Sequence, residues 1–325
     1  MTAAMKRVCV TGAGGFIGHH LVTSLKQEGY WVRGVDLKYP EYTEVDADEF
    51  ELLDLRRWDS ALQATRGVDQ VYALAADMGG MGYISTHHAE ILSNNSLINL
   101  HTLDAARING VQRYLYSSSA CIYPEYRQTE TDVVPLKESD AYPAQPQDAY
   151  GWEKLFTELL CTYYADEYSM QTRIVRFHNI YGPFGTYDGG REKAPAAICR
   201  KVAQVEDGGS IEIWGDGEQT RSFCYIDDCV EGIYRIMQSD YAKPLNLGTD
   251  EMVSIKQLAY LVAEVAGKRD IGLKQIPGPQ GVRGRNSDNS LLRKVLGWEP
   301  TTSLRDGLGP TYRWIEKMLT SGDHT

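Results

Sequence analysis

Several features of membrane, secreted and metal-binding proteins are missing from this chain of 325 residues. No run of about 18 apolar residues occurs, which argues against a membrane-spanning helix. The six cysteines include no CxxC pair and the seven histidines show no HxxxH or HExxH spacing, so neither a disulfide framework nor a metal site is predicted. The N-terminal segment has no apolar signal core. We therefore expect a cytoplasmic protein that does not associate with membranes.

Positive charge is also scarce. The chain has 33 Lys and Arg against 44 Asp and Glu, a formal net charge of −11. Such a surface would repel a polyphosphate backbone, so nucleic acid is not expected as a partner. A small phosphorylated ligand needs only a local basic pocket and is not excluded. The length exceeds what one hydrophobic core usually supports, which favours two lobes that share a cleft.

Strand patterns and helix patterns alternate through the first half of the chain. Short apolar runs are found at residues 7–11, 31–35, 50–53, 70–74, 113–117 and 172–177. Helical spacing is found at residues 16–28, 90–109 and 149–168. This alternation predicts an α/β fold with a doubly wound parallel sheet that is covered on both faces.

The second half is less regular. Helices are predicted at residues 196–206, 226–238 and 254–266, strands at 211–213 and 222–225, and two short helices at the end. Glycine-rich, charged loops at residues 183–195 and 277–289 are candidates for ligand binding. The adjacent His87 and His88 are expected on the surface of a helix.

Three glycines, Gly12, Gly15 and Gly18, lie between the first strand and the first helix. Glycine lets the backbone approach a pyrophosphate, and the helix N-terminus adds free N–H groups and the positive end of its dipole. Asp36 ends the second strand, where it can accept hydrogen bonds from both ribose hydroxyls and would repel a 2′-phosphate. The pattern predicts a site for NAD rather than NADP. The alternative is a tight turn followed by a loop cap.

Tyr150 and Lys154 lie one helical turn apart and share a face. An ammonium beside a phenol favours the phenolate, so we expect Lys154 to lower the pKa of Tyr150 toward a value useful for a base. Ser119, at the end of an earlier strand, can orient a substrate alcohol. The alternative is a packed tyrosine and a solvated lysine.

In this order, the glycine turn, the serine and the Tyr/Lys pair resemble the extended branch of the short-chain dehydrogenase/reductase superfamily. Residues 176–183, 215–223 and 296–300 look like the nucleotide-sugar-binding segments of that branch. The resemblance implies a Rossmann-like doubly wound sheet with a smaller α/β C-terminal substrate-binding lobe. Residues 1–178 would form the NAD-binding domain, to which 223–248 return, and 179–222 with 249–325 would form the nucleotide-sugar-binding lobe.

The resemblance also assigns roles to individual residues. Tyr150 would be the base, Ser119 would position a sugar hydroxyl, and Lys154 would hold the nicotinamide ribose of a tightly bound NAD that is regenerated in each turnover. Asp54 resembles an adenine-contacting aspartate, although it could equally cap the end of a strand. The expected cofactor-binding residues are Gly12, Gly15, Phe16, Ile17, Gly18, Asp36, Asp54, Ala75, Tyr150 and Lys154.

Two residues narrow the choice within the branch. Cys121 follows Ser119 by two positions, and its thiolate would be a good proton acceptor. Lys193 lies in the first glycine-rich loop, and a desolvated lysine can donate a proton. Taken singly, they could be a buried structural cysteine and a solvated loop charge. Together with residues 75–82, 119–125, 189–195, 219–223 and 281–289, they resemble the GDP-mannose 3,5-epimerase family.

That resemblance implies NAD-dependent oxidation of GDP-D-mannose at C4, inversion at C3 and C5, and reduction back to GDP-L-galactose. Inversion at C5 alone would give GDP-L-gulose. Cys121 would be the base and Lys193 the acid. The expected substrate-binding residues are Gly79, Ser119, Ala120, Cys121, Tyr150, Asn179, Glu192, Lys193, Ala194, Lys201, Gln219, Thr220, Arg221 and Arg283. The two arginines suit a diphosphate, because a planar guanidinium binds phosphate oxygens in pairs, although either alone could form a surface salt bridge.

Two alternatives stay open. The chain could be another NAD-dependent nucleotide-sugar enzyme, either a 4-epimerase or a 4,6-dehydratase, against which Cys121 and Lys193 argue. It could also be a non-catalytic NAD-sensing protein, although such proteins typically lose the Tyr or the Lys of the pair. The branch resemblance further implies a homodimer, in which helices 90–109 and 149–168 of two copies form a four-helix bundle.

Overall fold

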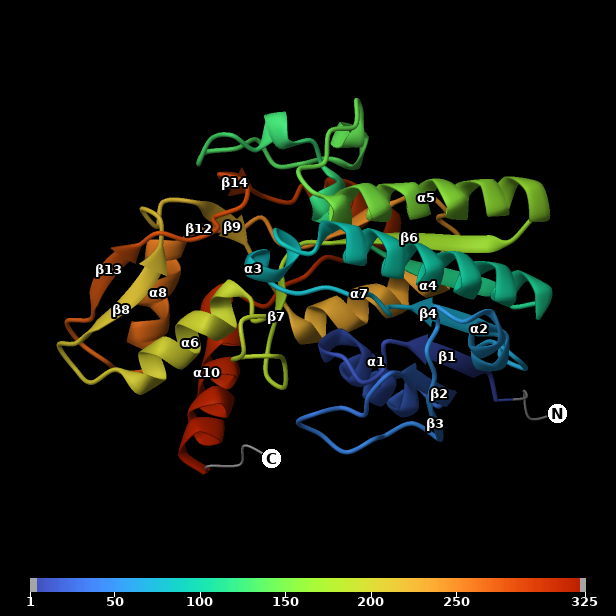
Figure 1. The fold of residues 1–325 in the computed structure, drawn as a ribbon, viewed down its shortest axis with the longest axis horizontal. Coiled ribbons are helices and arrows are strands. Elements are labelled where there is room, and N and C mark those ends of the chain that lie inside the picture. The colour runs from blue at the N-terminus through green and yellow to red at the C-terminus, as the bar shows by residue number, and fades with distance from the viewer. Residues whose placement is uncertain (1–4, 322–325) are drawn as a thin grey trace.

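A seven-stranded parallel sheet forms the centre of the computed structural model, which describes residues 5–321 (Figure 1). The strand order is β11-β6-β5-β4-β1-β2-β3, and every neighbouring pair is parallel. The strands are β1 (Arg7–Thr11), β2 (Trp31–Asp36), β3 (Glu49–Leu52), β4 (Gln70–Ala73), β5 (Arg113–Ser119), β6 (Gln171–Phe177) and β11 (Leu245–Leu247). The order reverses between β1 and β4, where such sheets bind ligands. The predicted doubly wound α/β fold is confirmed.

Helices cover both faces of this sheet (Figure 1). Helices α1 (Phe16–Gln27) and α7 (Ile226–Gln238) pack together on one face. On the other face α4 (His88–Ile108) lies between α2 (Trp58–Ala64) and α5 (Ala149–Tyr168). Asp148 caps α5, because its carboxylate accepts a hydrogen bond from the Gly151 N–H at 2.8 Å. Within residues 5–321, no helix has the length and apolarity needed to cross a membrane.

A second group of elements lies beyond the carboxyl ends of the sheet strands (Figure 1). Helix α6 (Ala194–Gln204) packs against α8 (Ile255–Val265) and α10 (Leu304–Ser321). Strand β8 (Ser210–Trp214) pairs with β13 (Gly272–Ile276), and β9 (Thr220–Ser222) lies between β12 (Met252–Ser254) and β14 (Gly284–Arg285). The remaining elements are α3 (Met81–Ile84), α9 (Ser290–Leu296), β7 (Ile180–Tyr181), β10 (Cys224–Tyr225) and the 3₁₀ turns Ala120–Ile122, Glu125–Arg127 and Glu138–Ala141.

Some predicted elements were wrong. The strand expected at 222–225 is interrupted at Phe223 and forms two strands, of which β9 pairs with β12 and β14 while β10 pairs with β7. The final helix, α10, has 18 residues and is not short. Strands β11 and β13 were missed, because β11 has only three residues and β13 mixes exposed polar side chains with apolar ones.

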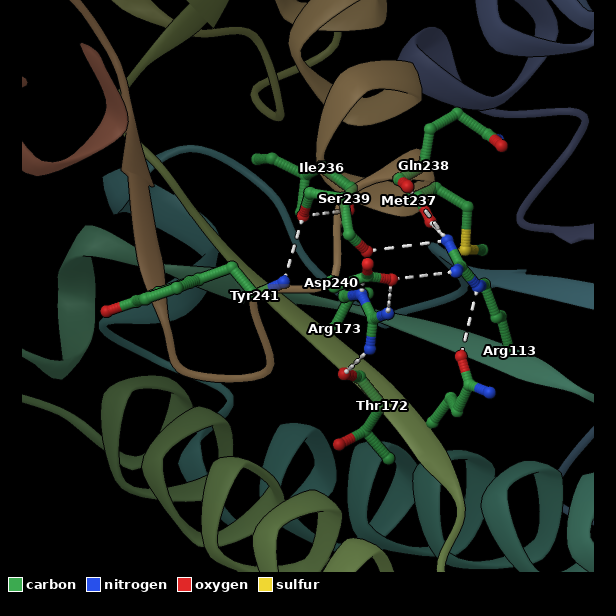
Figure 2. A network of polar contacts seen from close by, with 10 residues as sticks. Arg113, Thr172, Arg173, Ile236, Met237, Gln238, Ser239, Asp240 and Tyr241 are labelled. Atoms are coloured by element: carbon green, nitrogen blue, oxygen red, sulfur yellow. Dashed lines mark hydrogen bonds and ion pairs between the residues drawn. The ribbon is translucent and has the colours of Figure 1, made fainter. Parts of the chain in front are cut away.

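Two arginines near the amino ends of β5 and β6 bind the end of α7 (Figure 2). The Arg113 Nη1 atom donates to the carbonyls of Met237 and Gln238 at 2.8 and 2.9 Å. The Arg173 Nε atom donates to the Ser239 carbonyl at 2.7 Å. The last carbonyls of a helix have no partner within the helix, so these guanidinium groups cap α7 and fix it to the sheet.

Candidate active site

The predicted glycine turn lies between β1 and α1, at the carboxyl end of β1. Gly12 has a φ of 72°, and a Cβ there would lie 2.8 Å from the backbone nitrogen of Ala75, so only glycine fits. Gly15 is the N-cap of α1, and the N–H groups of Phe16, Ile17 and Gly18 form its first turn. Such first-turn N–H groups have no acceptor within the helix and suit a phosphate.

Asp36 and Asp54, the two predicted cofactor aspartates, are placed differently. The Asp36 carboxylate accepts hydrogen bonds from the N–H groups of Gly14 and Leu37 at 2.9 and 2.6 Å, which orients it beside the glycine turn. Burial raises its pKa, and these hydrogen bonds oppose the rise. Asp54 instead pairs with Arg56 at 2.8 Å, whose hydrogen bond lowers its pKa. The turn and Asp36 together offer the donors and the acceptor that NAD requires.

Ser119, Tyr150 and Lys154 meet at the carboxyl end of β5. The Lys154 Nζ atom donates to the Ser117 carbonyl at 2.9 Å and lies 5.4 Å from the centre of the Tyr150 ring. The Ser119 hydroxyl lies close enough to the Tyr150 phenol to influence its pKa. The three residues therefore form one group, although they lie far apart in the sequence.

The expected effect of Lys154 on Tyr150 is not found. Burial raises the pKa of Tyr150 well above its ordinary value, the nearby Cys121 and Glu153 add to the rise, and the Ser119 hydroxyl opposes it. Burial also lowers the pKa of Lys154. The sequence argument considered the lysine charge alone, whereas removal from water acts more strongly on the enclosed phenol.

Cys121 lies in the 3₁₀ turn Ala120–Ile122, directly after β5. Its N–H donates to the Ser119 hydroxyl at 3.1 Å, and its side chain packs in an apolar cluster with Tyr150 and Met78. Of the six thiols, Cys121 alone is partly exposed, and the other five are buried. The Arg285 Nη1 atom lies 3.4 Å from the Cys121 sulfur. This contact orients the sulfur toward the Arg285 guanidinium.

Lys193 is the N-cap residue of α6, and its charge lies close enough to Cys121 for the two to interact. Burial lowers the pKa of Lys193, while Cys121 and Cys229 oppose this change. Within residues 5–321 its ammonium has neither a hydrogen bond nor an ion pair. The loop before it is anchored, because the Gly80 N–H donates to the Arg191 carbonyl at 3.0 Å. Lys193 is thus held in place with its donors free for a ligand.

The two predicted diphosphate-binding arginines lie in different settings. The Arg221 Nη2 atom donates to the Val282 carbonyl at 2.7 Å, and burial lowers its pKa to about 9, with the charge of Arg285 contributing. Arg283 forms a two-pronged pair with Asp216 at the surface, with N–O distances of 2.7 and 2.8 Å. The structure therefore places Arg285, which the sequence argument missed, beside Cys121. The sequence did offer a signal for Arg285, because it lies two residues after Arg283 in the loop at 277–289, which was predicted to bind a ligand.

Several other predicted substrate residues contact the protein itself. The Asn179 amide donates to the Ser222 carbonyl at 3.0 Å, and the Lys201 ammonium donates to the Glu212 carbonyl at 2.6 Å. Gln219 differs, since its buried Oε1 atom has no partner within residues 5–321 and can accept from a ligand. The remaining members are Gly79 before α3, Ala120 in the 3₁₀ turn, Glu192 paired with Arg200, Ala194 at the start of α6 and Thr220 on β9.

Gly151 is a further site residue that sequence reasoning missed. A Cβ at this position would clash with the Cys121 carbonyl and lie 2.8 Å from the Pro146 Cβ. The first turn of α5, which carries Tyr150, therefore packs directly against the backbone that carries the thiol. The absence of a side chain at position 151 sets the separation of these two groups.

These features define a class of protein. The chain has a doubly wound parallel sheet, a glycine turn after β1 and a Ser–Tyr–Lys group at the carboxyl end of β5. Proteins with these features are enzymes of the dehydrogenase type that use a nucleotide cofactor. More narrowly, the chain belongs to the NAD dependent epimerase/dehydratase family, which matches residues 8–248.

Individual relatives are consistent with this assignment. GDP-mannose 3,5-epimerase 1 of Oryza sativa subsp. japonica is 54% identical over 315 residues, which cover 96% of this chain and 82% of the relative. The UDP-glucose 4-epimerase structure of Thermotoga maritima, with UDP-glucose, is 27% identical at a TM-score of 0.86 and covers 96% of this chain and 99% of its own. The UDP-glucuronic acid 4-epimerase of Bacillus cereus, in complex with UDP-glucuronic acid and NAD, is 26% identical at a TM-score of 0.81, with the same coverage.

Proposed function

We propose that this chain converts GDP-D-mannose to GDP-L-galactose by inverting C3 and C5. The observation that carries the proposal is the meeting of Cys121, Lys193 and Tyr150 at one site. Strong similarity to a GDP-mannose 3,5-epimerase over 96% of the chain supports it. A plain 4-epimerase has no use for a thiol base and a lysine acid beside the Tyr/Lys pair.

The reaction begins at C4. Tyr150 accepts the proton of the C4 hydroxyl, and Ser119 orients that hydroxyl through its own. The chemistry that NAD supplies when bound is removal of the C4 hydrogen as hydride and its later return. Lys154, whose ammonium donates to the Ser117 carbonyl, would offer its remaining donors to the ribose hydroxyls of NAD. Because the burial of Tyr150 raises its pKa, a positive charge brought close by the bound cofactor would help it to act as a base.

A ketone at C4 acidifies the hydrogens on both neighbouring carbons, since each carbanion is stabilised as an enolate. Cys121 removes the proton from one face of the ring, and Lys193 delivers a proton to the other. Before the second inversion, the thiol loses its proton to water and the Lys193 amine regains one from water. Arg285 stabilises the sulfur while it is negatively charged. One oxidation therefore allows two inversions, and inversion at C5 alone gives GDP-L-gulose.

The ligands are held by the two groups of elements together. We assign the NAD-binding domain to residues 1–178 with 223–248, and the nucleotide-sugar-binding lobe to 179–222 and 249–325. Tight binding of NAD is favoured by the glycine turn and Asp36, which lie at the carboxyl ends of β1 and β2. The cationic groups of Arg221, Arg285 and Lys193 favour the diphosphate and the sugar.

Incubation with GDP-mannose in heavy water tests the proposal. The purified protein should incorporate deuterium at C3 and C5 and release GDP-L-galactose with some GDP-L-gulose, as resolved by nuclear magnetic resonance of the products. Inversion at C4 alone would indicate a 4-epimerase, and loss of water would indicate a dehydratase. Absence of any exchange would favour the NAD-sensing alternative.

A homodimer through α4 and α5 is a further part of the proposal. An apolar stripe runs along the outer face of α5, where Trp152, Phe156, Leu159 and Tyr163 are all at least 40% exposed. Leu97 and Leu100 on the neighbouring α4 are exposed as well. Contiguous apolar area of this kind is typical of an interface between copies. Light scattering should give twice the mass of the chain, and Phe156→Asp should reduce it to the monomer.

A cytoplasmic location is also part of the proposal. All six cysteines are free thiols, as is usual in a reducing compartment. Thiol titration of the unfolded protein purified without reductant from its native host should recover all six.

A further inference from the structure

A buried ion pair contacts the segment that carries Cys121. Arg176 on β6 and Glu158 on α5 form this pair, with the Arg176 Nη2 and Nε atoms 2.7 and 2.9 Å from the two carboxylate oxygens. Their side chains are 3% and 5% exposed. No step proposed above uses either residue, so their burial as charges needs another explanation.

One end of the Cys121 turn is tied to Glu158. The hydroxyl of Ser118, the residue before Ser119, donates a short hydrogen bond to the Glu158 Oε1 atom. The same carboxylate oxygen accepts from the Arg176 Nε atom. These bonds fix the end of β5 relative to α5 and β6, just before the chain turns toward Cys121.

The other end of the turn is tied to Arg176. Tyr123 is completely buried, and its hydroxyl accepts from the Arg176 Nη1 atom at 3.1 Å. The hydroxyl then donates to the Asn246 Oδ1 atom at 2.6 Å. The amide of Asn246 is oriented in turn, because its Nδ2 atom donates to the Leu136 carbonyl at 2.8 Å. A guanidinium can only donate, so the Tyr123 hydroxyl must accept from Arg176 and donate to Asn246. The direction of each hydrogen bond in the series is therefore fixed.

The turn between these ties is short and has few hydrogen bonds of its own. It contains the three residues Ala120–Ile122, and 3₁₀ geometry gives poorer hydrogen bonds than an α-helix. An ion pair buried this deeply adds little to stability compared with apolar packing of the same volume. Its contribution is geometric, since one guanidinium links both ends of the turn.

We propose that Tyr123, Glu158 and Arg176 are positioning residues that hold the Cys121 sulfur against Arg285 and the sugar ring. The proposal deepens the proposed function and rests on it for the identity of the substrate. Removing a tie should move the sulfur while Ser119, Tyr150 and Lys154 stay in place. Proton transfer at C3 and C5 would then suffer more than oxidation at C4.

Tyr123→Phe is the test variant, because it keeps the buried ring and removes only the hydroxyl. The matched control is Tyr126→Phe in the same segment, whose exposed hydroxyl donates to the Pro143 carbonyl at 3.1 Å. With GDP-mannose in heavy water, Tyr123→Phe should lower the rate of exchange at C3 and C5 by about 10- to 100-fold. The rate of reduction of bound NAD, measured by absorbance, should stay within about twofold of the wild type. In the control variant, the exchange rate and the reduction rate should both stay within about twofold of the wild type.

Equal losses of exchange and NAD reduction would show a merely structural role, and unchanged exchange would also overturn the proposal. If Tyr123→Phe does not fold, Ser118→Ala removes the tie at the other end and should give the same selective loss. Its control is Ser303→Ala, which removes another serine–carboxylate hydrogen bond, to Asp306 at 2.6 Å, just before α10.

A second readout needs no substrate. Cys121 is the one thiol of the six that is not buried, so iodoacetamide should modify it selectively, and Cys121→Ser should abolish the reaction. Alkylation should be several-fold slower in Tyr123→Phe, because the sulfur loses its place beside the Arg285 guanidinium. An unchanged rate would contradict the positioning role. A wild type that exchanges no deuterium into GDP-mannose, yet shows this difference, would refute the proposed substrate alone.

Discussion

Two clusters of cations lie at opposite ends of the central sheet. Near the amino ends of β5 and β6, Arg113 and Arg173 donate to backbone carbonyls at the end of α7 and face Asp240 (Figure 2). At the carboxyl ends, Arg285 contacts the thiol of Cys121, the charge of Lys193 interacts with it, and no carboxylate within residues 5–321 pairs with Lys193.

The difference separates charges that hold the fold from charges prepared for a ligand. Buried donors are costly unless they are paired, and the arginines at the amino ends meet this requirement within the chain. The cluster at the carboxyl ends leaves donors available in a protein whose net charge is −11. A local positive site in an acidic protein suits a small anion, such as the diphosphate of a nucleotide sugar.

The largest expected effect is the loss of the thiol. Cys121→Ala should reduce product formation by about 100- to 10,000-fold, because it removes the proposed base for the C3 and C5 protons. Partial reduction of NAD by bound GDP-mannose should remain. Cys161→Ala, which removes a buried thiol on α5, is the control. Full epimerase activity in Cys121→Ala would remove the proposed base.

Lys193→Ala should reduce product formation by about 100-fold, since the enolate would lack its proton donor. A general acid must be protonated, so the rate should fall as pH rises through the pKa of Lys193. Burial lowers that pKa, which places this decline below the ordinary lysine value of about 10.4. The pH profile of product formation should show the decline in the wild type. A variant with undiminished product formation would count against the acid role.

Arg283 was predicted from the sequence to bind the substrate, whereas the structure places Arg285 beside Cys121, and substitution of each arginine tests which one matters for activity. Arg285→Lys should lower kcat by about tenfold, because a lysine cannot keep both the contact with Cys121 and the bond to the Gln128 side chain at 2.6 Å. Arg283→Lys should change it by less than about twofold, since Arg283 forms a surface pair with Asp216. If steady-state kinetics show a larger loss for Arg283→Lys than for Arg285→Lys, the prediction that Arg283 binds the diphosphate would be supported instead.

The smallest effect on activity is expected at the amino ends of the strands. Arg113→Ala should lower the free energy of unfolding by about 1–3 kcal/mol, because the carbonyls at the end of α7 lose their donor. Urea titration measures this change. The folded variant should keep its kcat, and a large loss of activity in it would show that the two clusters are coupled.

Local patterns predicted much of the fold. The bounds of α5 and α7 match the predicted helices, because the apolar periodicity of each helix lies within its own segment. Strand β11 could not be found this way, since its three residues contain the polar Asn246, which is stable there only because of distant partners. The division of 222–225 into two strands likewise depends on pairing with separate parts of the chain.

For the site, residue type and spacing predicted the glycine turn and the Tyr150–Lys154 pair, whereas the roles of Cys121 and Lys193 were predicted only from the resemblance to a family. Only the tertiary structure showed that Arg285 rather than Arg283 faces the sulfur, that Gly151 packs against the Cys121 backbone, and that enclosure raises the pKa of Tyr150. The reason is physical. Spacing specifies which groups share a local element, whereas desolvation and the direction of a side chain depend on segments that meet only when the chain has folded.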